Sequence, residues 1–189
     1  MDVIIRWSTV PRRRAAVAAC RYAPAGARSF GPMTAGTRFG GAYGSTANAE
    51  VACIPMIESR QAVEQIDDIL AVPGIDAIYI GPADLSLTYG LAPGLDNPDE
   101  VFQSALTRVV DSCRRHNVIA GIHASAALAQ RRHDGGFRLI TVGFDFQPIV
   151  AALRSDLVTA RKKKPARPER PLAPSGLTVH IMAQRDVHL

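Results

Sequence analysis

The chain has 189 residues, 47% of them hydrophobic and 21% charged, which is typical of a single globular domain with a substantial core. A complete (β/α)8 barrel typically needs about 250 residues. The net charge of +5 lies in the two ends: residues 1–48 carry +6, residues 49–160 carry −6 and residues 161–189 carry +5. A basic nucleic-acid-binding surface on the central part is therefore not expected.

The spacing of the cysteines and the length of the apolar runs further limit the class of protein. The three cysteines, Cys20, Cys53 and Cys113, lie far apart and form no CxxC pair, so neither a disulfide framework nor a zinc site is predicted. No apolar run approaches the roughly 18 residues that span a membrane. Residues 1–14 lack the apolar segment of a signal peptide, although their richness in arginine resembles a transit peptide. We expect a cytoplasmic protein without a membrane partner.

The first half of the chain predicts two buried strands and a helix. Residues 1–20 show no clean periodicity, and the three arginines at 12–14 are expected to interrupt any helix there. Residues 51–57 are a continuous apolar run, as in a strand buried on both faces, and residues 75–80, apolar except for Asp76, are predicted to be a second buried strand. Between them, apolar residues recur at helical spacing after Ser59, a typical N-cap residue.

The second half continues the alternation. Asn97, Pro98 and Glu100 fit the N-cap, N1 and N3 positions of a helix. Further strands are predicted over residues 118–123 and 139–142, and further helices over residues 126–134 and 148–161. Four strand–helix units in succession predict a parallel sheet, open or closed. Residues 162–189, rich in lysine, arginine and proline, have the composition of a disordered tail.

Two carboxylates follow neighbouring predicted strands. Glu58 ends the first strand, and Asp84 comes just after the second. In parallel α/β folds, active sites form at the carboxyl ends of the strands. Neighbouring strands lie about 4.8 Å apart, so the two carboxylates can share one cation. Hard divalent ions such as Mg2+ and Mn2+ prefer such oxygen ligands. The alternative is an N-cap role for Asp84 and a solvated Glu58.

A turn beside Asp84 favours an anionic ligand. Gly81 and Pro82 begin a short helix, which leaves the backbone N–H groups of Ala83 and Asp84 pointing into the cleft. A cation next to such a turn suits a 2-oxo acid, which chelates through its ketone and carboxylate oxygens.

These segments resemble a known family. Residues 54–59 (IPMIES), 74–86 (GIDAIYIGPADLS) and 20–28 (CRYAPAGAR) are similar to segments of the HpcH/HpaI aldolase/citrate lyase family, and residues 121–122 and 142–145 resemble its last two strands. The similarity covers residues 17–161. It implies a partial (β/α)8 barrel of the phosphoenolpyruvate/pyruvate-binding type, preceded by a divergent basic segment, residues 1–16, and followed by the tail, residues 162–189.

The resemblance implies a metal-dependent aldolase that reversibly cleaves 4-hydroxy-2-oxo acids into pyruvate and an aldehyde. Glu58 and Asp84 match the family's metal ligands, for Mg2+, Mn2+ or Co2+. Gly81, Ala83 and Asp84 match the turn that receives the pyruvate carboxylate. Family members assemble as oligomers, so a homo-oligomer is expected.

The chain also departs from the family. Met56 stands where many relatives have glutamine, and Met cannot donate a hydrogen bond to substrate. The early strands that supply the family's catalytic histidine and arginine have no counterpart in residues 1–16, which suggests a truncated or frame-disrupted member. Arg28 and His123 are weak catalytic candidates. The alternatives are a structural loop arginine and a histidine engaged in packing.

Three rival functions remain at this stage. A CoA-ester or citrate-type lyase of the same superfamily would share the carboxylate pair, but the short loop at residues 88–97 gives no sign of adenine binding. The chain can also be a catalytically inactive fragment. Nucleic-acid binding through the basic ends predicts a steep salt dependence that deletion of residues 162–189 abolishes.

Overall fold

The computed structural model describes residues 3–6 and 10–162 of the chain. The predicted disordered tail thus lies, except for residue 162, outside the described residues. Two compact units divide at residue 144, and each is described by itself. None of the described helices is both long and apolar enough to cross a membrane.

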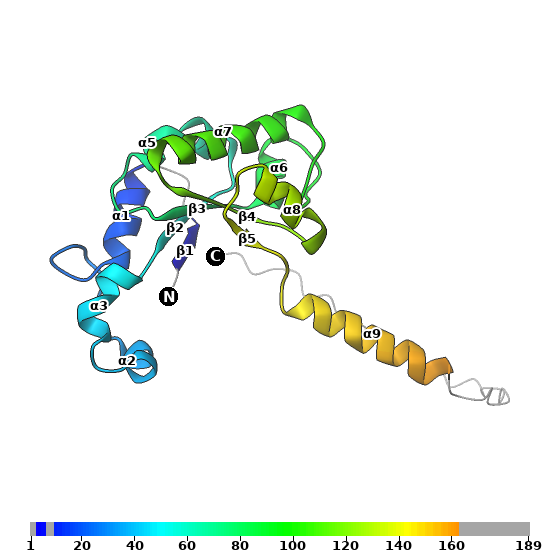
Figure 1. Ribbon diagram of the computed structural model, residues 1–189, viewed down its shortest axis with the longest axis horizontal. Helices are drawn as coiled ribbons and strands as arrows, with labels where there is room; N and C mark the ends of the chain where they lie inside the picture. Colours follow the sequence, from blue (N-terminus) through cyan, green and yellow to red (C-terminus); the bar gives the residue numbers. More distant parts are fainter. Residues whose placement is uncertain (1–2, 7–9, 163–189) are drawn as a thin grey trace, which may run out of the picture. The chain divides into compact units, whose positions relative to one another are not determined.

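The first unit is built on a five-stranded sheet in which every pairing is parallel (Figure 1). The strands are β1 (Val3–Arg6), β2 (Cys53–Ile57), β3 (Ala77–Ile80), β4 (Ile119–His123) and β5 (Leu139–Thr141). They lie in the sheet in the same order as in the chain. This order is that of a barrel wall, since a doubly wound sheet reverses its strand order at a switch point. The predicted parallel α/β fold is confirmed.

Helices connect the strands, and several of them lie against one face of the sheet (Figure 1). They are α1 (Val10–Cys20), α2 (Met33–Phe39), α3 (Tyr43–Glu50), α4 (Arg60–Glu64), α5 (Ile66–Leu70), α6 (Pro82–Thr88), α7 (Glu100–His116) and α8 (Ala126–Asp134). The main core lies between this layer and the sheet, where Ile57, Ile78 and Ile122 contribute to the same buried cluster as Phe102 and Val109 of α7.

The opposite face of the sheet carries different side chains. Ile54, Ala77 and Tyr79 form a smaller buried cluster there, with Met56 and Leu139 packed against it. Because successive side chains of a strand point to opposite faces of the sheet, every second residue of each strand, up to its carboxyl end, lies on this face. It corresponds to the inner face of a barrel wall.

Three local predictions were wrong. Helix α1 passes through the three arginines at 12–14, because arginine is a good helix former. The helix after Ser59 is two short helices that meet at Gln65. Asp99, and not Asn97, caps α7: the Asp99 carboxylate accepts from Val101 N, whereas Asn97 Oδ1 accepts from Asp99 N in the preceding turn.

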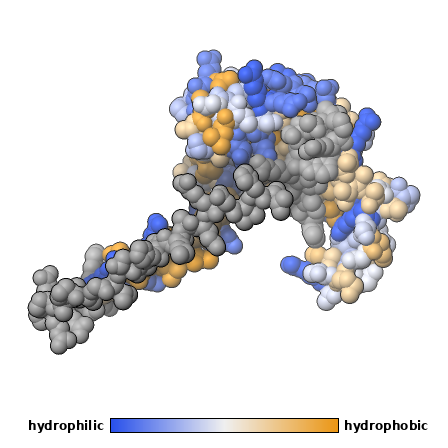
Figure 2. Space-filling view, turned by 180° about the vertical axis from the view of Figure 1, so that it is seen from behind, coloured by the Kyte–Doolittle hydropathy of each residue, from blue (hydrophilic) through white to orange (hydrophobic). Residues whose placement is uncertain are grey.

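The second unit contains helix α9 (Phe146–Lys162), which begins two residues before the predicted helix at 148–161. Phe146, Ile149, Leu153 and Leu157 recur along it at spacings of three and four residues and are exposed. Figure 2 shows the hydrophobic side chains along this helix. This spacing gives the helix an apolar stripe.

Candidate active site

A pocket of about 280 Å³ lies at the carboxyl ends of β2, β3 and β4. It is lined by Met56, Tyr79, Gly81, Pro82, Ala83, Asp84, Leu95, His123 and Phe144. The structure thus brings together four of the predicted site residues: Gly81, Ala83, Asp84 and His123. Each comes from the end of a strand or the turn that follows it, where a parallel α/β fold places its ligands.

Glu58, which follows β2, reaches the same edge of the sheet. A Cβ built on Gly81 would lie 3.6 Å from Glu58 Oε2 and 3.7 Å from Met56 Sδ. A side chain at position 81 would therefore fill the space in front of the Glu58 carboxylate. Asp84 lies one helical turn beyond Gly81, in the first turn of α6. Glu58 and Asp84 thus follow two neighbouring strands at the same edge of the sheet; Asp84 lines the pocket, whereas Glu58 is not among its described lining residues.

Within residues 3–6 and 10–162, no cluster of three or more His, Cys, Asp and Glu side chains is placed to hold a metal ion. A cation bound by Glu58 and Asp84 would therefore take further oxygen ligands from substrate or water. Mg2+ commonly binds in this way, through one or two carboxylates. The space beside Gly81 and the all-oxygen donor set fit such an ion.

The segment of residues 81–86 serves the core and the pocket together. Leu85 and Ser86 are fully buried, and the Ser86 hydroxyl donates to Pro82 O at 2.8 Å. Leu85 N–H donates to Gly81 O at 2.9 Å, which is the first backbone bond of α6. The Ala83 N–H therefore precedes the hydrogen-bond ladder of the helix. Ala83 and Asp84 face the pocket while their neighbours anchor the turn.

His123 lies at the carboxyl end of β4 and is held by its neighbours. Its Nδ1 is 2.7 Å from the Thr141 hydroxyl of β5, which also bonds to the Tyr79 hydroxyl of β3. The imidazole ring packs against Phe144, with 4.5 Å between ring centroids. Burial lowers the pKa of His123 and raises that of Tyr79. Both groups are therefore neutral near pH 7.

Arg28 lies elsewhere. Its guanidinium stacks over the Tyr22 ring, 4.6 Å from the centroid, and donates to the Tyr43 hydroxyl at 3.2 Å. It borders a larger pocket of about 580 Å³ beside α2, whose lining residues include no carboxylate or histidine. The structure does not bring Arg28 to the pocket that contains Asp84.

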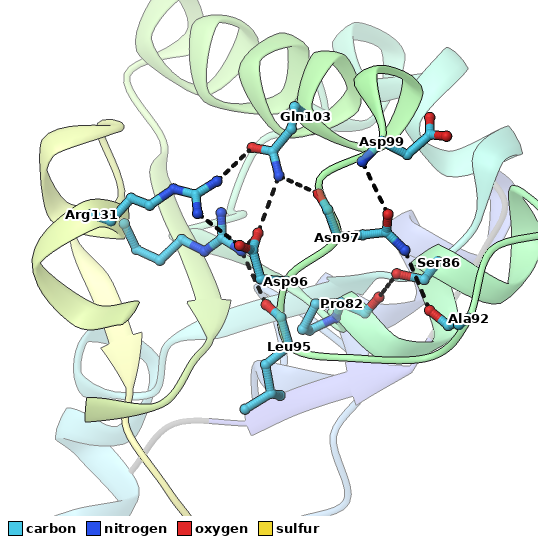
Figure 3. A network of polar contacts seen from close by, with 10 residues as sticks. Pro82, Ser86, Ala92, Leu95, Asp96, Asn97, Asp99, Gln103 and Arg131 are labelled. Atoms are coloured by element: carbon cyan, nitrogen blue, oxygen red, sulfur yellow. Dashed lines mark hydrogen bonds and ion pairs between the residues drawn. The ribbon is translucent and has the colours of Figure 1, made fainter. Parts of the chain in front are cut away.

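One side of the candidate active site is formed by the loop before α7, which a polar network holds in place (Figure 3). Arg132 of α8, with only 4% of its side chain exposed, donates to Asp96 Oδ1 at 2.8 Å and to Leu95 O at 3.0 Å. Arg131 donates to Asp96 Oδ2 at 2.7 Å, and Gln103 donates to Asp96 Oδ1 at 3.1 Å. The network fixes Leu95, which lines the pocket.

Comparisons with known proteins show which family the chain belongs to. The profile of the HpcH/HpaI aldolase/citrate lyase family matches residues 9–152, and the chain belongs to this family. This match begins before residue 17, where the resemblance was recognised from the sequence, and ends before residue 161.

Two curated relatives and one solved structure illustrate the similarity. A hydroxypyruvate/pyruvate aldolase from Rhizorhabdus wittichii is 37% identical over 144 residues, which cover 76% of this chain and 57% of the relative. A 4-hydroxy-2-oxovalerate aldolase from Novosphingobium aromaticivorans is 41% identical, covering 72% and 52%. The crystal structure of a family protein from Burkholderia cenocepacia, 32% identical, superposes with a TM-score of 0.72 and covers 85% of this chain and 65% of that one. The chain thus spans little more than half the length of these curated relatives.

The sequence did not reveal four residues of the site: Tyr79, Leu95, Thr141 and Phe144. Tyr79 could have been found from strand alternation, because it precedes Gly81 by two residues. Thr141 could not, because its pairing with His123 depends on the register of the assembled sheet. Leu95 and Phe144 lie in loops, where the sequence gives no comparable signal.

Proposed function

We propose that the chain is a divalent-metal-dependent aldolase, a carbon–carbon lyase that reversibly cleaves a 4-hydroxy-2-oxo acid into pyruvate and an aldehyde. The proposal depends on one observation: Glu58 and Asp84 lie close to Gly81 at the carboxyl ends of two neighbouring parallel strands. Two relatives named as aldolases of pyruvate and of 4-hydroxy-2-oxovalerate support the reaction class.

Each residue of the site has a distinct role in this proposal. Glu58 and Asp84 would hold Mg2+, Mn2+ or Co2+ through their carboxylate oxygens. Such an ion would supply Lewis-acid stabilisation of negative charge on the ketone oxygen of the substrate. The turn at Gly81, Ala83 and Asp84 receives the substrate carboxylate. Met56 borders the pocket without offering a hydrogen-bond donor.

A retro-aldol assay of the full chain tests the proposal. With Mg2+ or Mn2+ and a 4-hydroxy-2-oxo acid, pyruvate release is followed by lactate dehydrogenase. Glu58→Gln and Asp84→Asn should each lower kcat/KM by about 100-fold or more, since a Lewis acid contributes several kcal/mol and each 1.4 kcal/mol is a factor of ten. Glu64→Gln, at an exposed carboxylate paired with Arg60, is the matched control and should act as the wild type.

The outcomes separate the alternatives. If wild-type pyruvate release does not exceed that of Glu58→Gln, the chain is an inactive fragment. Activity only with a CoA ester or citrate would favour the other lyases of the superfamily. The expected cytoplasmic homo-oligomer remains a prediction, which light scattering tests for the assembly.

A further inference from the structure

The proposed reaction needs a group that moves a proton, and the carboxylates assigned to the cation do not supply it. A histidine is the commonest such group, and it works best when its neutral form predominates near the operating pH. Among the described residues that line the pocket, His123 is the only histidine. Its position, its fixed orientation and its hydrogen-bonding partners distinguish it from an ordinary surface histidine.

The register of the sheet brings three polar groups into line on the inner face. Tyr79 of β3 pairs with Gly121 of β4, and His123 two residues further along β4 pairs with Thr141 of β5. The Tyr79 hydroxyl, the Thr141 hydroxyl and His123 Nδ1 then form a continuous chain of two hydrogen bonds. These three side chains come from three successive strands, so the rigid sheet sets their geometry.

These two hydrogen bonds can form with either protonation state of the His123 imidazole. A hydroxyl can donate or accept, so Thr141 accepts when Nδ1 carries a proton and donates when it does not. Within the described residues Nδ1 is the imidazole nitrogen that is hydrogen-bonded, which leaves Nε2 for a ligand. Contact with the Phe144 ring fixes the imidazole plane. His123 can therefore gain a proton at Nε2 while the hydroxyl pair stabilises the resulting imidazolium.

We propose that His123 is the catalytic proton carrier of this chain and that Thr141 and Tyr79 are its positioning residues. In the cleavage direction Nε2 takes the proton of the substrate's 4-hydroxyl group. The C3–C4 bond breaks, its electron pair forms the enolate of pyruvate, and the aldehyde carbonyl forms at C4. The proton on Nε2 is then delivered to C3, which gives the methyl group of pyruvate and restores the neutral imidazole. This inference rests on the proposed aldolase function.

Hydrogen–deuterium exchange at the methyl group of pyruvate isolates this proton transfer from carbon–carbon cleavage. The full chain is incubated with Mg2+ and pyruvate in D2O, and loss of the methyl signal is followed by 1H NMR. His123→Gln should slow exchange by about 100-fold or more, as general acid–base catalysis contributes 10²–10⁴-fold. His133→Gln, at an exposed histidine of α8, is the matched control and should exchange at the wild-type rate.

The positioning residues should shift the pH dependence. In Thr141→Val the imidazolium loses its acceptor, so the midpoint of the pH profile should move to lower pH and the maximal rate should fall. A residue with a purely structural role would lower the amount of folded enzyme without moving that midpoint. Tyr79→Phe should produce a smaller shift in the same direction, since Tyr79 acts through Thr141.

A binding measurement keeps the two proposals separable. In the wild type, paramagnetic Mn2+ with pyruvate should broaden the His123 ring signals far more than those of His133. If Mn2+ and pyruvate bind but His123→Gln exchanges at the wild-type rate, the role of His123 is wrong and the aldolase proposal stands. Binding without any exchange in the wild type also overturns the role of His123. If Glu58→Gln binds Mn2+ as tightly as the wild type, the aldolase proposal fails, and the inference with it.

Discussion

The buried pair between Arg132 and Asp96 allows a quantitative test of what holds the loop beside the pocket. Arg132 is 4% and Asp96 24% exposed, and Arg132 Nε is a buried nitrogen without a hydrogen-bond partner among the residues that the structure describes. Partial burial raises the Asp96 pKa, but the Gln103 hydrogen bond and the charges of Arg132 and Arg131 outweigh it and hold the pKa below its usual value. The pair is therefore ionised at neutral pH.

The two halves of the pair should not be equivalent. Asp96→Asn removes the only acidic partner of the Arg132 guanidinium within the described residues, and an uncompensated buried charge costs about 3–5 kcal/mol. Arg132→Met leaves Asp96 paired with Arg131 and Gln103, so the loss is about 2–3 kcal/mol, within the range for hydrogen bonds to a charged group. Arg60→Met, at an exposed pair, should lower the free energy of unfolding far less than either change.

Urea denaturation of the full chain, followed by circular dichroism, gives the three free energies of unfolding. The reasoning is refuted if Arg132→Met costs as much as Asp96→Asn, or if both costs match that of Arg60→Met. A double-mutant cycle at positions 96 and 132 then gives the coupling energy directly.

Further predictions concern the packing around Gly121, the reactivity of two buried cysteines and the stability of the protein at low pH. A Cβ on Gly121 would lie 2.6 Å from Ile78 O, so Gly121→Ala should lower the free energy of unfolding by about 1–3 kcal/mol, whereas Gly36→Ala, in open space, should not lower it. Burial raises the pKa values of Cys53 and Cys113 to about 12, so both should resist a thiol reagent at pH 8 until the chain unfolds, and stability should fall as pH rises from about 9 towards 12. The folded-state pKa of Asp96 is depressed, so its contribution to stability is present above the unfolded pKa of about 3.9 and is lost as pH falls through the folded value. In a series of denaturation experiments from pH 6 to pH 2, Asp96→Asn should therefore lose less stability towards low pH than the wild type.

The strands, and with them the positions of the candidate carboxylates, could be predicted because burial on both faces leaves continuous apolar runs. The segments of residues 51–57 and 77–80 have this pattern, and the positions of Glu58 and Asp84 follow from where those runs end. Helices α2 and α3 were not predicted, because their alanines, glycines, serines and threonines give no apolar period. Such a helix depends on tertiary contacts, such as those of buried Tyr43 and Ala47.

The polar chain at His123 could not be predicted for a different reason. Its existence depends on which residue of β5 stands opposite His123, and register is a property of the assembled sheet. The composition of residues 139–141 fits a strand in any register. The cap of α7 was missed because Asn97 and Asp99 are both good capping residues, and the loop geometry decides between them.

The double role of residues 81–86 has a mechanical consequence. The Leu85 and Ser86 side chains are buried in the core, and they hold the backbone of Ala83 and Asp84 in place. Loosening the interior at Leu85 would displace the pocket's polar groups without altering any atom that a ligand touches. Ligand affinity and thermal stability should thus change together across a series of Leu85 variants, because packing on the helix-covered face of the sheet keeps the pocket rigid.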